Sequence, residues 1–250
     1  SQHCVSRKRG EEINMKPSAY YKTKTSYEDK KVDSANKTVP FAVVEAYKAI
    51  RTNLMFLLSQ TRSHIFEISS SLPGEGKSSC SVNLSIAFSQ LGSKVLLIDA
   101  DLRKPSVYRQ LRLQNTKGLS SVLVNFCDFS DAVVHINSNL DVLVSGPTPP
   151  NPSEMLGSEQ MSNLLNSVKD KYDYIVIDTP PVNVVSDAIA LAPKTEGIVM
   201  VVQDRETTHE EFKKAVASLQ FANARLLGVV LNGSSDKTAK YSSKLQRYQY

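Results

Sequence analysis

The sequence predicts an α/β fold, in which a doubly wound, mostly parallel sheet carries helices on both faces. Apolar runs of strand length alternate along the chain with segments of helical periodicity, which is the first sign of this fold. Most of the runs are continuously apolar, as is typical of parallel strands covered on both sides. A glycine-rich turn between the first run and the helix after it is the third sign.

The elements follow in chain order from these patterns. A helix is expected behind Pro40, which suits a first-turn position, and its apolar face is formed by Val43, Tyr47, Ile50, Leu54 and Leu58. Further helices are expected over Ser78–Leu91, Ser158–Lys171, Val185–Leu191 and Thr208–Ala222. The expected strands are His64–Ser69, Lys94–Asp99, Leu140–Ser145, Tyr174–Asp178, Gly197–Gln203 and Leu226–Asn232. The proline-rich stretch Gly146–Leu156 reads as a rigid connector between a strand and a helix.

The composition indicates a soluble globular chain. Its 250 residues are 41% hydrophobic and 22% charged, which suits one α/β domain with tails. Cys4, Cys80 and Cys127 have no metal-like spacing and form no even set, so a reducing cytoplasm is the expected compartment. No apolar run reaches the roughly 18 residues that a membrane helix needs.

The net charge of +5 is unevenly placed and suggests three parts. Residues 1–39 carry +4, residues 40–233 carry −2 and residues 234–250 carry +3. We therefore expect a flexible basic arm over residues 1–38, a globular domain over residues 39–233 and a flexible tail over residues 234–250. Basic tails on a near-neutral domain favour anionic surfaces or acidic partners, or simple solubility, and argue against a nucleic-acid partner.

A phosphate-binding loop is predicted at SLPGEGKSS (Ser71–Ser79), which fits the pattern G-x-x-x-x-G-K-[ST] with Ser71 in place of the first glycine. The loop follows a strand and opens a helix, so its backbone N–H groups and the helix N-terminus can bind an anion. Lys77 is expected to reach the β- and γ-phosphates, and Ser78 to hold Mg²⁺. The expected nucleotide-binding residues are Pro73, Gly74, Glu75, Gly76, Lys77, Ser78 and Ser79.

Three aspartates end two of the predicted strands. Asp99 and Asp101 stand one residue apart after one strand, and Asp178 ends another. The carboxyl ends of parallel strands are where such sheets bind ligands, so all three carboxylates can face the phosphates. Around one Mg²⁺ they can hold its water shell and raise the basicity of one member, which then accepts a proton from a hydroxyl. A lone strand-end aspartate is often only a helix cap.

The sequence resembles the bacterial tyrosine kinases that govern capsule and exopolysaccharide export. LPGEGKSS, VLLIDADLRKP and YIVIDTPPV are similar to the Walker A, A′ and B motifs of that family, and GLSSVL (Gly118–Leu123) and SGPTPPNPSEML are similar to further segments. The likeness covers roughly residues 40–233. It implies a P-loop NTPase fold of the deviant-Walker, septum-positioning-ATPase type and an ATP- and Mg²⁺-dependent protein-tyrosine kinase.

The resemblance also assigns roles to residues. The catalytic set would be Lys77, Asp99, Asp101 and Asp178, with Asp99 as the base that accepts the proton of the tyrosine. Ser78, Asp101 and Asp178 would hold the metal. Arg103 matches the arginine of the family's D-x-D-x-R pattern, although a fold-stabilising ion pair explains it equally well. Asn232 is a candidate for adenine recognition, with a strand-end cap as the alternative.

Tyrosines near the end of the chain are the expected phosphate acceptors. In the family, a C-terminal tyrosine cluster is modified in trans by a neighbour in a ring, and this chain offers Tyr241, Tyr248 and Tyr250. The alternative is that these rings pack on the domain. The segment EAYKAIRTNL resembles the family's E-x-x-R-x-x-R oligomerisation motif, with Lys48 between Glu45 and Arg51 where the family usually has arginine.

The resemblance implies a homo-oligomeric ring at the inner face of the membrane, held there by a transmembrane activator of the polysaccharide co-polymerase type. His3–Asn14 reads like the basic stub of such an activator, or else a tag remnant or native arm. Two other functions stay open. One is a P-loop ATPase that positions partners at the membrane, although Leu72 stands where those ATPases carry a signature lysine. The other is a nucleotide-sensing scaffold whose output is assembly.

Overall fold

The computed structural model describes residues 40–233. The predicted arm (1–38) and tail (234–250) lie outside the described residues, and with them the expected acceptors Tyr241, Tyr248 and Tyr250 and the activator-like stretch His3–Asn14. Within residues 40–233, no helix has both the length and the apolar character needed to cross a membrane.

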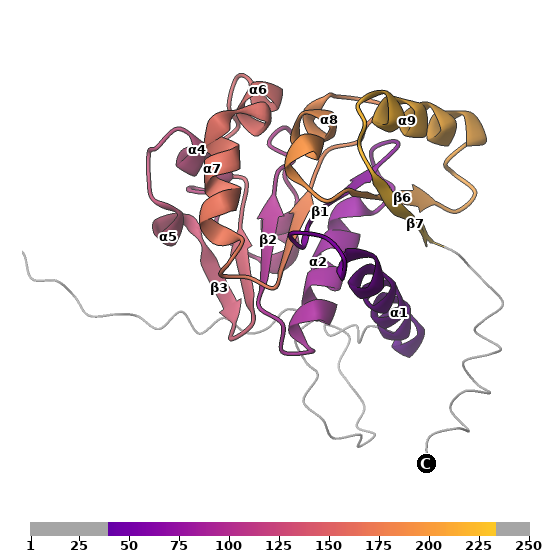
Figure 1. Cartoon of the computed structure of the whole chain (residues 1–250), viewed down its shortest axis with the longest axis horizontal. Helices are drawn as coiled ribbons and strands as arrows, with labels where there is room; N and C mark the ends of the chain where they lie inside the picture. Colours follow the sequence, from indigo (N-terminus) through magenta and orange to yellow (C-terminus); the bar gives the residue numbers. More distant parts are fainter. Residues whose placement is uncertain (1–39, 234–250) are drawn as a thin grey trace, which may run out of the picture. The chain divides into compact units, whose positions relative to one another are not determined.

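A seven-stranded sheet forms the centre of the domain, in the order β3-β4-β2-β5-β1-β6-β7 (Figure 1). Every pairing is parallel except that of β3 with β4. The strands are β1 (Ile65–Ser70), β2 (Val95–Asp99), β3 (Val134–Asn137), β4 (Leu140–Leu143), β5 (Tyr174–Asp178), β6 (Ile198–Gln203) and β7 (Leu226–Asn232). The non-consecutive order of β2, β5, β1 and β6 is that of a doubly wound sheet, as predicted.

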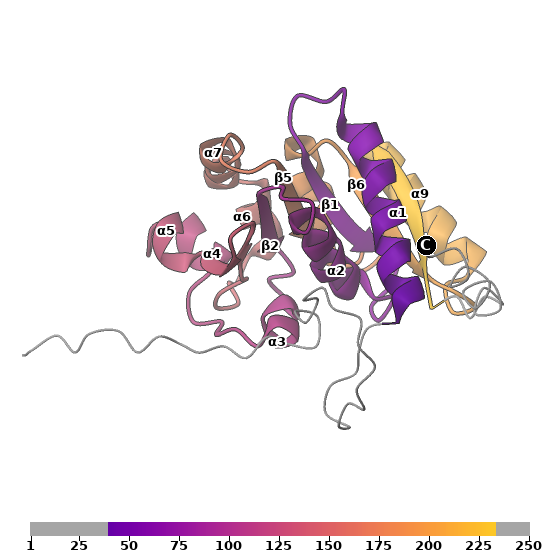
Figure 2. The same cartoon turned by 90° about the horizontal axis from the view of Figure 1, so that it is seen from below.

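Helices cover both faces of this sheet (Figures 1 and 2). The longer ones are α1 (Phe41–Leu58), α2 (Lys77–Ser89), α7 (Glu159–Val168) and α9 (His209–Phe221). The short ones are α3 (Val107–Leu111), α4 (Leu119–Leu123), α5 (Phe129–Ala132), α6 (Pro152–Gly157), α8 (Asp187–Leu191) and the 3₁₀ turn η1 (Ala192–Lys194). On one face α2 packs its Phe88 against Phe66 of β1 and Tyr174 of β5. On the other face α4, α6 and α7 share one hydrophobic cluster with β2 and β5, and α8 and α9 share another with β6.

All six predicted strands and all five predicted helices are confirmed, with small differences at their ends. The central strands β1, β2 and β5 are buried along their whole length, which explains why their sequences are continuously apolar. The antiparallel edge strand β3 was not predicted. It has four residues of alternating burial, too short for its period to stand out in the sequence.

Four short helices, α3 to α6, were also not predicted. Each has six residues or fewer, which is less than two helical turns and gives no recognisable periodicity. The proline-rich stretch Gly146–Leu156 is therefore only partly a connector, because its end forms the start of α6. Pro152 occupies the first turn of that helix, where its missing N–H costs no hydrogen bond.

Candidate functional site

A pocket of about 340 Å³ opens at the carboxyl ends of the neighbouring strands β2, β5 and β1. The loop between β1 and α2 forms one wall, and the turn after β2 forms a second, with Asp101, Arg103 and Lys104. The loop after β5 forms a third wall with Pro180, Pro181, Val184 and Val185. The pocket thus lies where doubly wound sheets bind their ligands.

The β1–α2 loop is shaped by two glycines with left-handed backbone angles. Gly74 has a φ of 91° and Gly76 a φ of 88°, which residues with a side chain rarely adopt. At Gly76 a Cβ atom would also lie 2.1 Å from Nδ2 of Asn232, so any other residue would have to displace that amide from its hydrogen bonds. Gly76 immediately precedes α2, whose first N–H groups are free to face an anion in the pocket.

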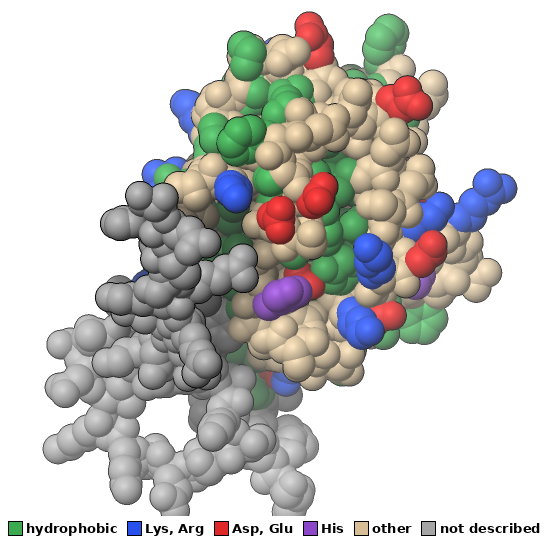
Figure 3. Space-filling model, turned by 90° about the vertical axis from the view of Figure 1, so that its left-hand side faces the viewer, with side chains coloured by type: hydrophobic (Ala, Val, Ile, Leu, Met, Phe, Trp, Pro, Cys, Tyr) green, Lys and Arg blue, Asp and Glu red, His purple; other side chains and the backbone are tan. Residues whose placement is uncertain are grey.

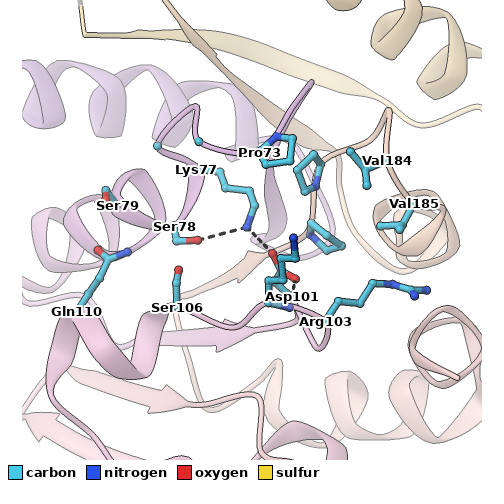
Figure 4. Close-up of a pocket in the computed structure, with 15 residues that line it drawn as sticks. Pro73, Lys77, Ser78, Ser79, Asp101, Arg103, Ser106, Gln110, Val184 and Val185 are labelled. Atoms are coloured by element: carbon cyan, nitrogen blue, oxygen red, sulfur yellow. Dashed lines mark hydrogen bonds and ion pairs between the residues drawn. The ribbon is translucent and has the colours of Figure 1, made fainter. Parts of the chain in front are cut away.

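Lys77 extends from the first turn of α2 across the pocket towards the strand ends (Figure 4). Its Nζ lies 2.7 Å from Oδ2 of Asp101 and 3.8 Å from Oδ2 of Asp178, and it donates to Oγ of Ser78 at 3.3 Å. Burial works to lower the pKa of Lys77, but the nearby carboxylates outweigh it and raise that pKa above its ordinary value. The lysine is therefore a fixed positive charge, held ready for the oxygens of a phosphate.

Asp178 is fully buried next to Lys77, outside the pocket lining, and one of its oxygens has no hydrogen-bond partner. Its Oδ1 accepts a hydrogen bond from Oγ of Ser81 at 2.9 Å, whereas its buried Oδ2 accepts none. Burial outweighs the charge of Lys77 and raises the pKa of Asp178. A buried oxygen without a hydrogen bond is costly unless a ligand uses it, so this atom fits a cation.

The oxygens around Asp178 suit Mg²⁺ better than other metals. Asp178, Asp101 and the hydroxyl of Ser78 offer the hard oxygen donors that Mg²⁺ prefers. Within residues 40–233 no three His, Cys, Asp or Glu side chains form a metal-binding group. Mg²⁺ is typically held by one or two carboxylates together with water and phosphate oxygens, so this sparse donor set fits it.

Asp99 lies behind the other acids and does not line the pocket. It is fully buried, and it faces Asp178 directly across the β2–β5 pairing. Both of its oxygens accept backbone N–H bonds, Oδ1 from Asp101 at 3.2 Å and Oδ2 from Val107 at 3.1 Å. Burial and the charge of Asp178 raise the pKa of Asp99 to about 8. The pKa of Asp99 is thus close to neutral pH, but it is Asp101, and not Asp99, that lines the pocket.

Glu75 and Asn232 tie the phosphate loop to the ends of β6 and β7. Oε2 of the buried Glu75 accepts the N–H of Leu72 at 2.9 Å, and its Oε1 accepts the hydroxyl of Thr207. Nδ2 of Asn232 donates to the backbone oxygen of Glu75 at 3.0 Å and to Oε1 of Gln203 at 3.2 Å. Glu75 was predicted as a nucleotide contact, and in the structure its carboxylate accepts hydrogen bonds from Leu72 within the loop and from Thr207 after β6. The brace formed by Thr207 and Gln203 was missed, because polar residues at the end of a strand carry no specific signal.

Arg103 lies in the pocket wall and is held by a buried acid on α8. Its Nε and one terminal nitrogen each lie 3.0 Å from an oxygen of Asp187, which is fully buried and also accepts the hydroxyl of Ser153. In Figure 4 Arg103 points away from Lys77, on the side of the pocket where Val185 lies. This bidentate pair is the fold-stabilising ion pair that the sequence allowed as the alternative role of Arg103. Together with Ser153, it links the turn after β2 to α6 and α8. Asp187 was not predicted, because its partner is 84 residues away in the sequence.

Comparison with known proteins places this pocket in a family. A family model described as an AAA domain matches residues 63–224. Tyrosine-protein kinase YwqD of Bacillus subtilis is 43% identical over 199 residues, which cover 79% of this chain and 83% of that protein. Putative tyrosine-protein kinase CapB of Staphylococcus aureus is 38% identical over 80% of this chain and 88% of that protein. The chain belongs to the bacterial tyrosine-protein kinases.

Solved structures agree with membership of the bacterial tyrosine-protein kinases. The chimerical protein CapA2B2 is 40% identical with a TM-score of 0.72 and covers 75% of this chain and 83% of its own. The kinase domain of the Escherichia coli tyrosine kinase ETK is 33% identical with a TM-score of 0.74, and the match covers 83% of this chain and 79% of that one. The septum site-determining protein MinD of Pyrococcus horikoshii, complexed with Mg-ADP, is 26% identical with a TM-score of 0.58. The match covers 69% of this chain and 72% of that one. The fold is that of nucleotide-binding P-loop proteins, as predicted.

The three residues predicted for the kinase ring interface differ in their surroundings. Glu45 and Lys48 form an exposed ion pair of 2.7 Å on α1. Arg51, one turn further on, instead donates to the backbone oxygen of Ala87 in the last turn of α2 at 2.6 Å. Glu45 and Lys48 are therefore accessible to a partner, whereas the guanidinium of Arg51 is used to dock α1 on α2.

Proposed function

We propose that this chain is an ATP-dependent protein-tyrosine kinase that autophosphorylates its C-terminal tyrosines in trans and regulates capsular or exopolysaccharide synthesis and export. The observation that carries the proposal is the arrangement of Lys77, Asp101 and Asp178 at the start of α2 and the ends of β2 and β5. It combines one fixed cation for phosphate with oxygens that suit a metal. Sequence identity of 43% to a tyrosine-protein kinase over most of both chains supports the choice of reaction.

The proposed reaction is a phosphoryl transfer in which one bond to phosphorus forms and one breaks. The phenolic oxygen of a tyrosine forms a bond to the γ-phosphorus of ATP, the bond to the oxygen that bridges the β- and γ-phosphates breaks, and ADP leaves. The phenol proton passes to a carboxylate. Such a transfer needs mainly positioning and charge stabilisation, which buried fixed charges supply without reorganising.

The charged and polar residues at the pocket have different roles in that step. The N–H groups after Gly74 and Gly76 and the ammonium of Lys77 would bind the phosphate oxygens. Ser78, Asp101 and Asp178 would hold Mg²⁺, which when bound neutralises charge on the phosphates. Asp99 is the proposed proton acceptor, in keeping with its pKa of about 8. To be reached by a phenol, Asp99 has to become accessible past Asp101.

The proposal extends to partners and location. A homo-oligomeric ring would bring the tail of one subunit, with Tyr241, Tyr248 and Tyr250, to the pocket of its neighbour. Glu45 and Lys48 are the accessible residues of the proposed interface. A transmembrane activator of the polysaccharide co-polymerase type would hold the ring at the inner face of the membrane. The similar solved protein CapA2B2 is a chimera, which accords with kinases of this type working beside a second component.

A P-loop ATPase that positions partners is the second candidate, favoured by the similarity to MinD. Leu72 separates the two candidates, because it stands at the place of the signature lysine of those ATPases. Its N–H donates to Glu75 and its side chain offers no charge to a nucleotide in a second subunit.

Replacing Lys77 with Met tests the assignment of the pocket. Incubation of the purified chain with ATP and Mg²⁺ should yield phosphotyrosine, mapped by mass spectrometry. Lys77→Met should abolish it, because the γ-phosphate loses its cation, while the circular dichroism spectrum stays unchanged. Lys213→Met on the exposed face of α9 is the matched control and should keep full activity. Persistent labelling in the Lys77 variant, or release of inorganic phosphate without any phosphotyrosine in the wild type, would contradict the proposal.

A further inference from the structure

We propose that the mouth of the nucleotide pocket selects acidic substrates, so that the preferred acceptor is a tyrosine flanked by Asp or Glu in another protein. This inference rests on the proposed kinase activity and adds a substrate class to it. It is drawn from a set of cations beside the pocket that the phosphoryl-transfer step does not use.

The cations lie in one short stretch that has no acids. Between Leu102 and Cys127 the chain has five Lys or Arg residues and no Asp or Glu. The rest of residues 40–233 holds twelve Lys or Arg against nineteen Asp or Glu, a net charge of −7. Outside this stretch the domain therefore carries a net negative charge. We call its cations the basic rim: Arg103, Lys104, Arg109, Arg112 and Lys117.

Two residues of the basic rim line the pocket, and the whole rim is in contact with solvent. All five residues are exposed. Arg103 and Lys104 line the pocket, and Gln110 of α3, which also lines it, lies between Arg109 and Arg112 in the sequence. The side chains of Lys104, Arg112 and Lys117 form no ion pair with any residue in the described part of the chain. Their charges are thus available to a partner.

The basic rim differs from another face of the domain. On the face beside α5 and β3, on the left in Figure 1, Figure 3 shows side chains of both signs interspersed. An acceptor peptide that brings its tyrosine to the γ-phosphate has to pass the mouth of the pocket, where it meets the positive charges of Arg103 and Lys104. Opposite charge at such a mouth raises the rate of association, and like charge lowers it.

The chain's own tail does not match this field. Residues 234–250 hold four Lys or Arg residues against one Asp. The cations of the tail and those of the basic rim have the same sign, so they repel one another. A proximity effect in an oligomer can still drive modification of the tail, because a tethered segment has a high effective concentration. A free acceptor has no such advantage, so its rate of association depends on the charge of the residues that flank its tyrosine.

The test uses three synthetic tyrosine peptides that differ only in their flanking residues, which are Glu, Gln or Lys. Initial rates with Mg-ATP at low ionic strength should give the Glu peptide a kcat/KM about tenfold or more above that of the Lys peptide. The difference should lie in KM and should narrow at about 0.15 M salt, where the Debye length is roughly 8 Å. The double variant Arg112→Glu with Lys117→Glu should remove the preference, because it changes the charge of the rim by −4.

The matched control is Lys213→Glu with Lys214→Glu, which makes the same charge change on exposed residues of α9, away from the pocket. It should keep the preference for the Glu peptide. Equal kcat/KM values for the three peptides, or a preference that survives in the rim variant, would overturn the inference. So would retention of duplex DNA or anionic vesicles by the wild type but not by the rim variant, combined with equal peptide rates. If neither a peptide nor the tail is phosphorylated, the proposed kinase function itself has failed.

Discussion

At the scale of single residues, the ammonium of Lys77 and the carboxylates of Asp101 and Asp178 form a compact charged group that burial makes strong. The side chains of Lys77 and Asp101 are only 11% and 5% exposed, so their attraction is weakly screened. A buried pair of this kind adds little net stability, because desolvation offsets the attraction. We interpret the pair as a resting arrangement in which Asp101 occupies the place of a phosphate at Lys77.

The two aspartates at the end of β2 should separate into a base and a ligand. Asp99→Asn should lower kcat by about 10²- to 10⁴-fold with a smaller change in the nucleotide Kd, because the side chain loses its basicity and keeps only one of its two backbone hydrogen bonds. Asp101→Asn should instead weaken binding of Mg-ATP, since it removes a proposed metal ligand. Stopped-flow binding and single-turnover kinetics measure both. A weaker nucleotide affinity with normal kcat in the Asp99 variant would show that Asp99 acts only as a brace for the turn.

Glu67 should make the domain less stable as the pH rises. This glutamate of β1 is fully buried, and its Oε1 accepts from the hydroxyl of Thr195 at 3.1 Å while Oε2 accepts nothing. Burial raises the pKa of Glu67 well above its ordinary value. Because the folded state keeps a proton that the unfolded chain has already lost, stability is complete below the unfolded pKa. It falls as the pH rises towards the folded pKa, by up to about 1.4 kcal/mol per pH unit.

Glu67→Gln should flatten this dependence, because the amide carries no titrating proton. Thermal unfolding from pH 5 to pH 8 should show a smaller loss of stability in the variant than in the wild type. Glu206→Gln, an exposed acid in the turn after β6, is the control and should follow the wild type. Parallel pH profiles for wild type and Glu67 variant would refute the explanation.

At the scale of elements, α1 depends on one polar contact as well as on its apolar face. Leu54 and Leu58 are buried, and Arg51 places its charge at the carbonyl end of α2, where a cation is favoured by the helix dipole. The motif that predicted an oligomer interface on α1 thus contains one residue, Arg51, whose side chain joins α1 to another helix of the same chain.

Single substitutions on α1 should therefore have different effects. Arg51→Ala should destabilise the monomer by about 1.5–3 kcal/mol, because a charge-assisted hydrogen bond to a backbone carbonyl is lost. Glu45→Ala, at an exposed pair, should change monomer stability by less than about 1 kcal/mol, yet dissolve the proposed ring. Thermal unfolding and light scattering of the same samples separate the two effects. An unchanged mass in the Glu45 variant would exclude this interface.

The sequence predicted those parts of the domain in which a short run of residues directly reflects burial or backbone conformation. The central strands are apolar because both faces are buried, and the phosphate loop carries its glycines because Gly74 and Gly76 need left-handed angles. Contacts between distant residues left no such pattern. The brace of Glu75 by Thr207 and the support of Arg103 by Asp187 join residues 132 and 84 positions apart. The burial of Asp99 behind Asp101 likewise depends on how the turn folds back to Val107.

At the scale of the whole molecule, charge links three elements at the pocket. Lys77 begins α2, Asp101 lies in the turn after β2 and Asp178 ends β5, so a ligand that changes the contacts of Lys77 affects both aspartates. Arg103 and Lys104 of the basic rim line the same pocket. The proposed site for a phosphate and a metal thus lies next to the surface that we propose attracts acidic acceptors.

A crystal structure of the chain with a non-hydrolysable ATP analogue and Mg²⁺ tests the central claim most directly. The account predicts that the triphosphate lies against the N–H groups of the β1–α2 loop and that Nζ of Lys77 leaves Asp101 for the phosphate oxygens. Oδ2 of Asp178, which accepts no hydrogen bond here, should gain a partner in the metal shell. A structure in which the analogue binds elsewhere while Lys77 keeps its 2.7 Å contact with Asp101 would contradict the account.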